Sequence, residues 1–268
     1  MSVPAATVPT PAGRPGRLVV VLRTQRPVER ACYLIAAVLV LSGLVHLGVA
    51  VAFPRPWGGP LSWRKPVTFG TSFGTVLLTI TWVTSHLRLP DRTRTVLLTV
   101  FAADCILEVT GITVQAWRDA PSHFNTVGTL DAVIAYGLAI GGAVLLATLG
   151  AFAFTALRGR IDAPVSMRRA IRAGFALLMA GLAAGVAMIV RGEQLIGAGH
   201  RTLAYDTAGY LKWFHAITLH AVLVLPALAW WLARTQRSQA QQRRTVTAAI
   251  GAYLFAAAIA LVVCIARS

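Results

Sequence analysis

Seven long apolar segments constrain this chain more than any other feature of its sequence. They lie at residues 31–53, 67–87, 95–116, 127–157, 173–196, 211–234 and 245–267. Each is long enough, at about 1.5 Å per helical residue, to cross a hydrocarbon core about 30 Å thick. Lipid cannot satisfy free backbone amides, and no segment alternates as a barrel strand does. The sequence therefore predicts an all-α integral membrane bundle of seven transmembrane helices.

The charge content separates this chain from several other classes of protein. Only 13% of its 268 residues are charged, against about 25% in soluble domains, which excludes a soluble enzyme, a disordered chain and a disulfide scaffold. The net charge of +16 is typical of nucleic-acid binding, but the basic residues lie between the apolar segments. No nucleic-acid partner is therefore expected. Residues 1–30, rich in Pro, Ala and Arg, predict a disordered tail before a membrane domain of residues 31–268.

The basic residues also predict an orientation in the membrane. Seventeen of the 25 lie in the N-terminal tail and in the loops after the second, fourth and sixth segments. The other eight lie on the opposite side. Because cytoplasmic loops carry the excess of Lys and Arg, we expect the N-terminus in the cytoplasm and the C-terminus outside, in a multi-pass protein of the cell membrane.

The third segment carries two acidic residues on one helical face. Asp104, Glu108, Gly111 and Gln115 are spaced by four, three and four residues, which brings them onto one side of a helix. Carboxyl groups at membrane depth are costly, and they normally face a bundle interior or a watery cavity. Burial favours the neutral form, so the two acids could share a proton. We interpret Glu108 and Asp104, with Asp131 of the fourth segment, as candidate catalytic acids; the alternative is a hydrogen-bonded pair that only joins helices.

Polar side chains gather on the predicted outer side. We interpret nine of them as candidate substrate- or lipid-binding residues: Trp63, Arg64, Lys65, Trp117, Arg118, His123, Asn125, His215 and His220. Each has a structural alternative. The tryptophans could anchor the protein at the membrane interface, Asn125 could cap a helix, and Arg64 and Lys65 could bind lipid phosphate.

Three histidines are the candidates for metal or haem ligation, should such a group be bound: His46, His215 and His220. His215 and His220 are five residues apart, so their rings point about 140° apart on a helix, whereas ligation from one face uses a spacing of three or four. Ligands would have to come from separate helices. The sequence requires no cofactor and predicts no metal site.

Short motifs in these segments add a family resemblance. They are Ser62-Trp63-Arg64-Lys65-Pro66 with Phe69-Gly70, Ser122-His123-Phe124-Asn125, and His220-Ala221 with Leu225-Pro226. These motifs resemble those of an uncharacterised family of bacterial polytopic membrane proteins that is frequent in actinobacteria. The resemblance covers most of residues 31–235, and it implies a topology and motif positions but no reaction.

Several functions compete on this sequence. The first is a membrane-embedded enzyme whose buried acids act on a lipophilic isoprenoid or lipid, in a terpene-cyclase-like or lipid-hydrolase-like reaction. The second is a haem- or metal-binding electron-transfer protein. A proton-coupled transporter is less favoured, because a pathway needs polar groups in the inner half too, and a structural or lipid-binding subunit is a further alternative. Membrane lipid and a lipophilic small molecule are the expected partners.

Overall fold

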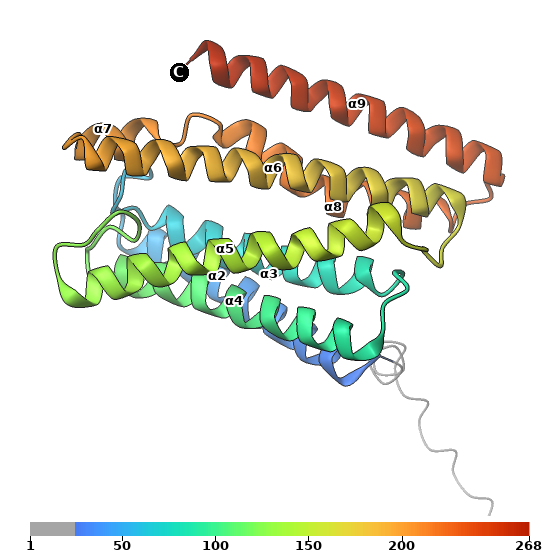
Figure 1. Cartoon of the computed structure of the whole chain (residues 1–268), viewed down its shortest axis with the longest axis horizontal. Coiled ribbons are helices and arrows are strands. Elements are labelled where there is room, and N and C mark those ends of the chain that lie inside the picture. Colours follow the sequence, from blue (N-terminus) through green and yellow to red (C-terminus); the bar gives the residue numbers. More distant parts are fainter. Residues whose placement is uncertain (1–24, 268) are drawn as a thin grey trace, which may run out of the picture.

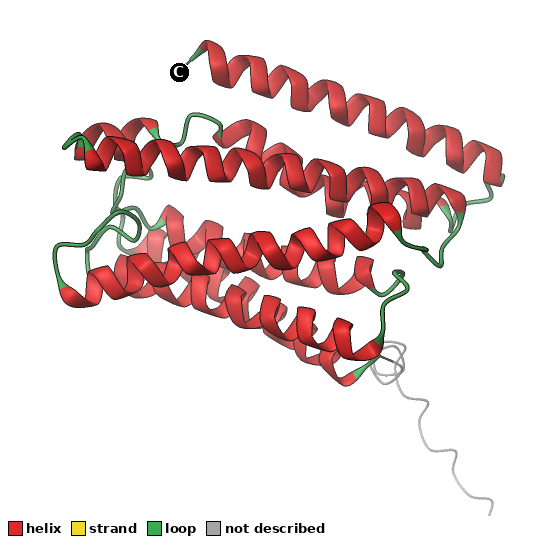
Figure 2. Ribbon diagram, in the orientation of Figure 1, coloured by secondary structure: helices red, strands yellow, loops and turns green. Residues whose placement is uncertain are grey.

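The computed structural model describes residues 25–267, which form eight helices joined by short loops (Figures 1 and 2). Seven of these helices are long and apolar enough to cross a membrane, which confirms the predicted all-α fold and is typical of a multi-pass membrane protein. The helices are α2 (Pro27–Ala52), α3 (Arg64–Thr84), α4 (Asp91–Trp117), α5 (Thr129–Arg158), α6 (Val165–Gly197), α7 (Arg201–Thr207), α8 (Lys212–Leu232) and α9 (Gln239–Ala266). The short helix α7 was not predicted.

Several helices begin earlier than the apolar segments, because polar residues form their first turns. α2 begins at Pro27, where proline suits the first helical position and the Glu29 carboxylate accepts a hydrogen bond of 3.1 Å from the Arg26 backbone N–H. α6 begins at Val165 rather than near residue 173. Of the tail predicted for residues 1–30, residues 1–24 lie outside the described residues, whereas residues 27–30 are helical.

The long helices form two groups. In the N-terminal group, α2 packs along α3 and both contact α4; in the C-terminal group, α6 packs along α8 and both contact α9. α5 connects the groups, since it contacts α4 on one side and α6 on the other. Figure 1 shows α9 at one edge of the bundle and α2 and α4 at the opposite edge.

Small residues allow a close contact between α2 and α3. A Cβ on Gly70 would lie 2.7 Å from the backbone nitrogen of Gly43, and a Cβ on Gly74 would lie 2.7 Å from the carbonyl oxygen of Ala36. The two backbones therefore touch along the step from Gly70 to Gly74. Such small-residue contacts bring membrane helices together where the hydrophobic effect cannot.

The connecting segments gather at two ends of the bundle (Figure 1). The loops 53–63 and 118–128 lie with α7 at one end, called here the α7 end. The loops 85–90, 159–164 and 233–238 lie at the other end, called the arginine end because of its side chains. The positive-inside rule predicts that the arginine end is cytoplasmic.

Candidate functional site

A cavity of about 400 Å³ lies between the two helix groups. Its walls come from α3, α4, α5, α6 and α8 and from the 118–128 loop, and they are mainly apolar, with side chains such as Phe69, Phe73, Leu138, Leu178 and Met188. Four titratable side chains also line it: Glu108, His123, Glu193 and His215. Its volume and its few polar groups in an apolar wall are typical of small-molecule binding sites.

Two carboxyl groups lie together on the α4 side of this cavity. Asp104 is 6% exposed and Glu108 is 5% exposed. A Cβ on Gly141 of α5 would lie 2.8 Å from Asp104 Oδ1 and 2.8 Å from Glu108 Oε1, so these oxygens are no farther apart than twice that distance. Only glycine at position 141 leaves room for both carboxyl groups.

No cation in the described part of the chain compensates the carboxyl pair. Among residues 25–267, no donor forms a hydrogen bond with Asp104 or Glu108, and Asp104 Oδ2 is buried without a partner. Two negative charges in such surroundings would each carry a large desolvation cost as well as repelling one another. At least one of the two groups therefore holds a proton, and Glu108, which lines the cavity, can present it there.

The face of α4 that was predicted to carry Asp104, Glu108, Gly111 and Gln115 packs against α5. A Cβ on Gly111 would lie 3.0 Å from Leu138, and the Gln115 amide donates a hydrogen bond of 3.1 Å to Asp131 Oδ1. Asp131 also accepts a hydrogen bond of 2.5 Å from Arg118, so its charge is compensated. It lies ten residues, or about 15 Å of helix, from Gly141. The structure therefore does not bring Asp131 together with the carboxyl pair.

His123 closes the cavity toward the α7 end. Its ring lies 6.1 Å from the ring of Phe69, and its Nδ1 is 3.0 Å from Ser122 Oγ. Lys65 Nζ donates a hydrogen bond of 3.1 Å to the same hydroxyl, which leaves the hydroxyl proton for His123 Nδ1 and places the imidazole proton on Nε2. Burial and, to a smaller extent, the charge of Lys65 lower the pKa of His123 to about 4. This imidazole is therefore neutral at pH 7.

The loop that carries His123 is held in an unusual backbone conformation. Phe124 has φ of 60°, which is rare for a bulky residue. Its ring packs against Gly192 of α6, where a Cβ would overlap the ring, and Tyr205 of α7 donates a hydrogen bond of 3.3 Å to the His123 carbonyl oxygen. Contacts with α6 and α7 therefore fix the position of His123 in the cavity wall.

His215 and Glu193 line the cavity from the C-terminal group. His215 Nδ1 lies 2.7 Å from the carbonyl oxygen of Gly181, which can only accept, so Nδ1 donates and Nε2 is the acceptor of the neutral ring. Glu193 is exposed, which shows that the cavity reaches the surface near the α7 end. Glu193 was not predicted as a site residue.

The two predicted tryptophans join helices instead of lining the cavity. Trp117 Nε1 donates a hydrogen bond of 3.0 Å to His46 Nε2, and Trp63 Nε1 donates one of 3.0 Å to the Phe53 carbonyl oxygen. His46 Nδ1 lies 2.7 Å from the Ser42 carbonyl oxygen. Both nitrogens of His46 are thus engaged, and neither is available to a metal.

Five other predicted binding residues lie away from the cavity wall: Arg64, Lys65, Arg118, Asn125 and His220. Arg64 Nε donates to the Trp57 carbonyl oxygen, and the buried Asn125 accepts from the Val127 backbone N–H. His220 is exposed, with Nδ1 2.6 Å from the Ala216 carbonyl oxygen. Within residues 25–267, no three His, Cys, Asp or Glu side chains are grouped so that they could hold a metal ion.

Two further residues of the site were not predicted, although the sequence contains a signal for each. Gly141 lies four residues after Gly137, a spacing typical of helix packing in membranes, but the groups that approach Gly141 most closely are the two carboxyls. Ser122 precedes His123 in the second motif, and it connects that motif to Lys65 of the first.

No family model, curated protein or solved structure matches the chain.

Proposed function

We propose that this protein is a membrane-embedded enzyme that uses the Asp104–Glu108 pair as an acid toward a lipophilic substrate held in the cavity, in the cell membrane. The observation that carries the proposal is that Glu108, which lines an apolar cavity of about 400 Å³, is paired with Asp104, and that neither carboxyl group has a cationic partner within residues 25–267. Glu108 lies nine residues from the end of α4, which corresponds to about 13 Å of helix. At that depth, the substrate would meet the acid within the hydrocarbon region.

An isoprenoid suits the cavity better than an ester lipid. Transfer of the Glu108 proton to a carbon–carbon double bond creates a carbocation on the substrate, which aromatic faces stabilise. Phe69 and Phe73 line the cavity and stack with ring centroids 5.5 Å apart. Ester hydrolysis would instead require an activated water and donors for an oxyanion, and the polar groups of the cavity are few.

The remaining residues have complementary parts in this reaction. Asp104, adjacent to Gly141, would take up a proton from solvent, which reaches the cavity near the exposed Glu193, and pass it to Glu108 after each transfer. The neutral Nε2 of His215 would accept a proton from the carbocation, which forms a new double bond and balances the proton that Glu108 supplied. His215 would release to solvent the proton that it takes from the substrate. The net reaction is an isomerisation or cyclisation without gain or loss of atoms.

The motif resemblance forms part of the proposal. The Ser62–Pro66 and Ser122–Asn125 motifs contact one another, because Lys65 donates to Ser122 and Ser122 bonds to His123. We assign the chain to the bacterial family that these motifs resemble, and we expect that family to share the cavity.

Proton transfer to the substrate can be measured in heavy water. The purified protein in detergent would be incubated with geranylgeraniol or squalene in D₂O, and deuterium in the product measured by mass spectrometry. We expect Glu108→Gln to abolish deuterium incorporation and Asp104→Asn to reduce it. Asp131→Asn is the matched control, because Asp131 is paired with Arg118, and it should behave as wild type. Full incorporation by Glu108→Gln would refute the role of Glu108.

A second measurement does not need the substrate. Dicyclohexylcarbodiimide is an apolar reagent that modifies protonated carboxyl groups in apolar surroundings. Peptide mass spectrometry should find the label on Glu108 and not on Asp131. Labelling of Asp131 alone would place the acid on α5 and contradict the proposal.

A further inference from the structure

The arginine end contains two pockets on either side of one ion pair. Arg88 Nε donates to both carboxylate oxygens of Asp162, at 2.8 and 2.7 Å, and this contact lowers the pKa of Asp162. Among residues 25–267, Asp162 is the only acidic side chain that lines either pocket. The first pocket, of about 300 Å³, is lined by Arg88, Arg160, Arg168 and Arg172. The second, of about 430 Å³, is lined by Arg26, Arg88 and Arg94.

The two loops that form these pockets are tied together. Leu87 and Ile161 form an isolated antiparallel bridge, and both side chains are buried. The Arg88 backbone N–H donates to the Arg160 carbonyl oxygen at 3.1 Å, and the Asp162 N–H donates to the His86 carbonyl oxygen at 2.8 Å. The arginines therefore project from a fixed surface.

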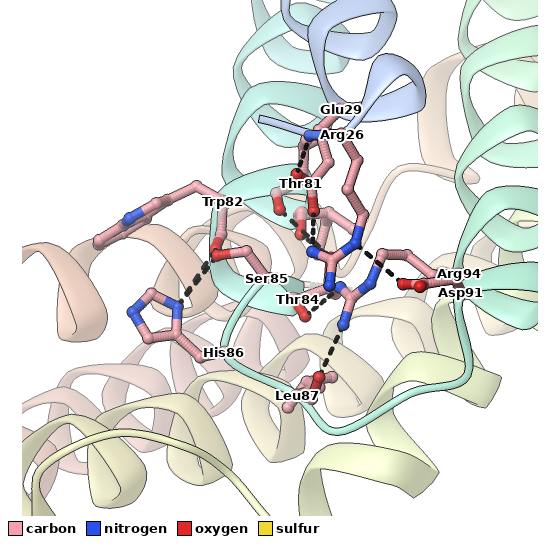
Figure 3. A network of polar contacts seen from close by, with 11 residues as sticks. Arg26, Glu29, Thr81, Trp82, Thr84, Ser85, His86, Leu87, Asp91 and Arg94 are labelled. Carbon is pink, nitrogen blue, oxygen red and sulfur yellow. Dashed lines mark hydrogen bonds and ion pairs between the residues drawn. The ribbon is translucent and has the colours of Figure 1, made fainter. Parts of the chain in front are cut away.

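Arg94 is a buried cation in the wall of the second pocket. It is 2% exposed, and its terminal nitrogens donate to the carbonyl oxygens of Thr84 at 2.5 Å and Leu87 at 2.7 Å (Figure 3). Its Nε is buried without a hydrogen-bond partner. These bonds are to backbone carbonyls, and no carboxylate is paired with Arg94 in the described range. A buried charge in this state favours a nearby anion.

The other arginines leave a surplus of positive charge at this end. Arg26 is paired with Glu29 and Asp91 (Figure 3), as Arg88 is with Asp162. Arg160 and Arg168, in contrast, donate no side-chain hydrogen bond to any residue between 25 and 267. Arg160 and Arg168 border the first pocket and Arg94 borders the second, and none of the three is paired with a carboxylate within residues 25–267.

We propose that this end of the bundle binds a phosphate group, carried by an anionic membrane lipid or free in solution, between Arg160 and Arg168 and beside the Arg88–Asp162 pair. Guanidinium groups match phosphate oxygens with paired, charge-assisted hydrogen bonds. The pockets lie at the ends of membrane-spanning helices, where lipid headgroups are found. This site is independent of the proposed reaction, which takes place in the other cavity.

The test compares two double variants that remove equal charge. Arg160→Gln/Arg168→Gln alters the first pocket; Arg243→Gln/Arg244→Gln, near the start of α9 at the same end of the bundle, lines neither pocket and is the control. Affinity would be read from thermal unfolding in detergent with added dioleoylphosphatidylglycerol, with dioleoylphosphatidylcholine as the neutral lipid. General attraction to an anionic surface falls equally in both double variants, because they remove the same charge. At about 1.5 kcal/mol for each lost hydrogen bond to a charged group, we expect the pocket variant to bind the anionic lipid about a hundredfold more weakly than the control variant.

A parallel measurement with inorganic phosphate shows whether the bound phosphate group belongs to a lipid headgroup or is free in solution. Stabilisation by the anionic lipid alone, lost in the pocket variant and kept in the control, supports a headgroup site. Stabilisation by inorganic phosphate with the same dependence on Arg160 and Arg168 supports a site for free phosphate. Equal responses of the two double variants, or no response of the wild-type protein to either compound, would overturn the proposal.

Discussion

Replacing Gly141 by alanine places a methyl carbon 2.8 Å from a carboxyl oxygen of Asp104 and 2.8 Å from one of Glu108. Both contacts are closer than real Cβ atoms show, so both carboxyl groups must move. They are the ends of side chains, so we expect them to shift while the backbones of α4 and α5 keep their places. The substitution therefore displaces the proposed acid without removing either of its residues.

Two opposing terms set the effect on stability. Alanine is favoured over glycine inside a helix by about 0.8–1.0 kcal/mol, whereas an extra methyl group in a packed interior costs about 1–3 kcal/mol. Gly141→Ala should therefore change the free energy of unfolding by between about zero and 2 kcal/mol of destabilisation. Gly137→Ala is the matched control on the same helix, because a Cβ there meets nothing within 4 Å, and it should leave stability unchanged or slightly higher.

Activity should respond far more strongly than stability. Misplacing a reacting group by about 1 Å can cost about a hundredfold in rate, so we expect deuterium incorporation to fall by about that factor in Gly141→Ala and to stay at the wild-type level in Gly137→Ala. In an Asp104→Ala/Glu108→Ala background, the carboxyl groups are gone and Gly141→Ala should become as harmless as Gly137→Ala. If Gly141→Ala still destabilises that background, or keeps full activity in the wild type, the proposed contact is wrong.

Three further predictions concern single side chains. The pKa of His123 is lowered to about 4 from an ordinary value of 6.5 in the folded protein, so between pH 6.5 and 4 this side chain takes up a proton only in the unfolded chain. At 1.36 kcal/mol per pH unit, discounted for partial exposure, we expect acidification over this range to lower the free energy of unfolding by about 2 kcal/mol. The dependence of stability on pH should be flatter in His123→Gln. Trp117→Phe leaves His46 Nε2 without its donor and should lower stability by about 1 kcal/mol in thermal unfolding; an unchanged Tm would contradict this. Arg94→Lys cannot reach both carbonyl oxygens and should cost about 2 kcal/mol, whereas an equally stable variant would show that the guanidinium fork is dispensable.

The spans were predictable because a membrane requires long apolar segments, and this requirement is visible in any window of the sequence. The face with Asp104 and Glu108 was predictable because helical spacing alone decides it. The same geometry predicted that His215 and His220 cannot both face one site, and the structure places His215 in the cavity wall and His220 at the surface. Helical spacing within single segments therefore predicted the carboxyl pair and the separate positions of the two histidines.

The rest of the site depends on contacts between distant parts of the chain. Trp117 pairs with His46, 71 residues away, and Lys65 reaches Ser122 across 57 residues. In the sequence, Asp131 resembles Glu108, because each is an acidic residue within an apolar segment. In the fold, the 118–128 loop brings Arg118 to Asp131, and the two form an ion pair. No local pattern distinguishes a carboxylate that will be paired from one that will not.

The apolar wall of the cavity has a consequence for selectivity. A lipophilic molecule that leaves the bilayer for this cavity exchanges one apolar environment for another, so burial of its surface contributes little to binding. Acyl chains and detergent tails should therefore occupy the same space and compete with any substrate. Discrimination between these occupants must come from the few polar groups in the wall, which include Glu108, His123, Glu193 and His215. Turnover in detergent should therefore depend on the length of the detergent chain.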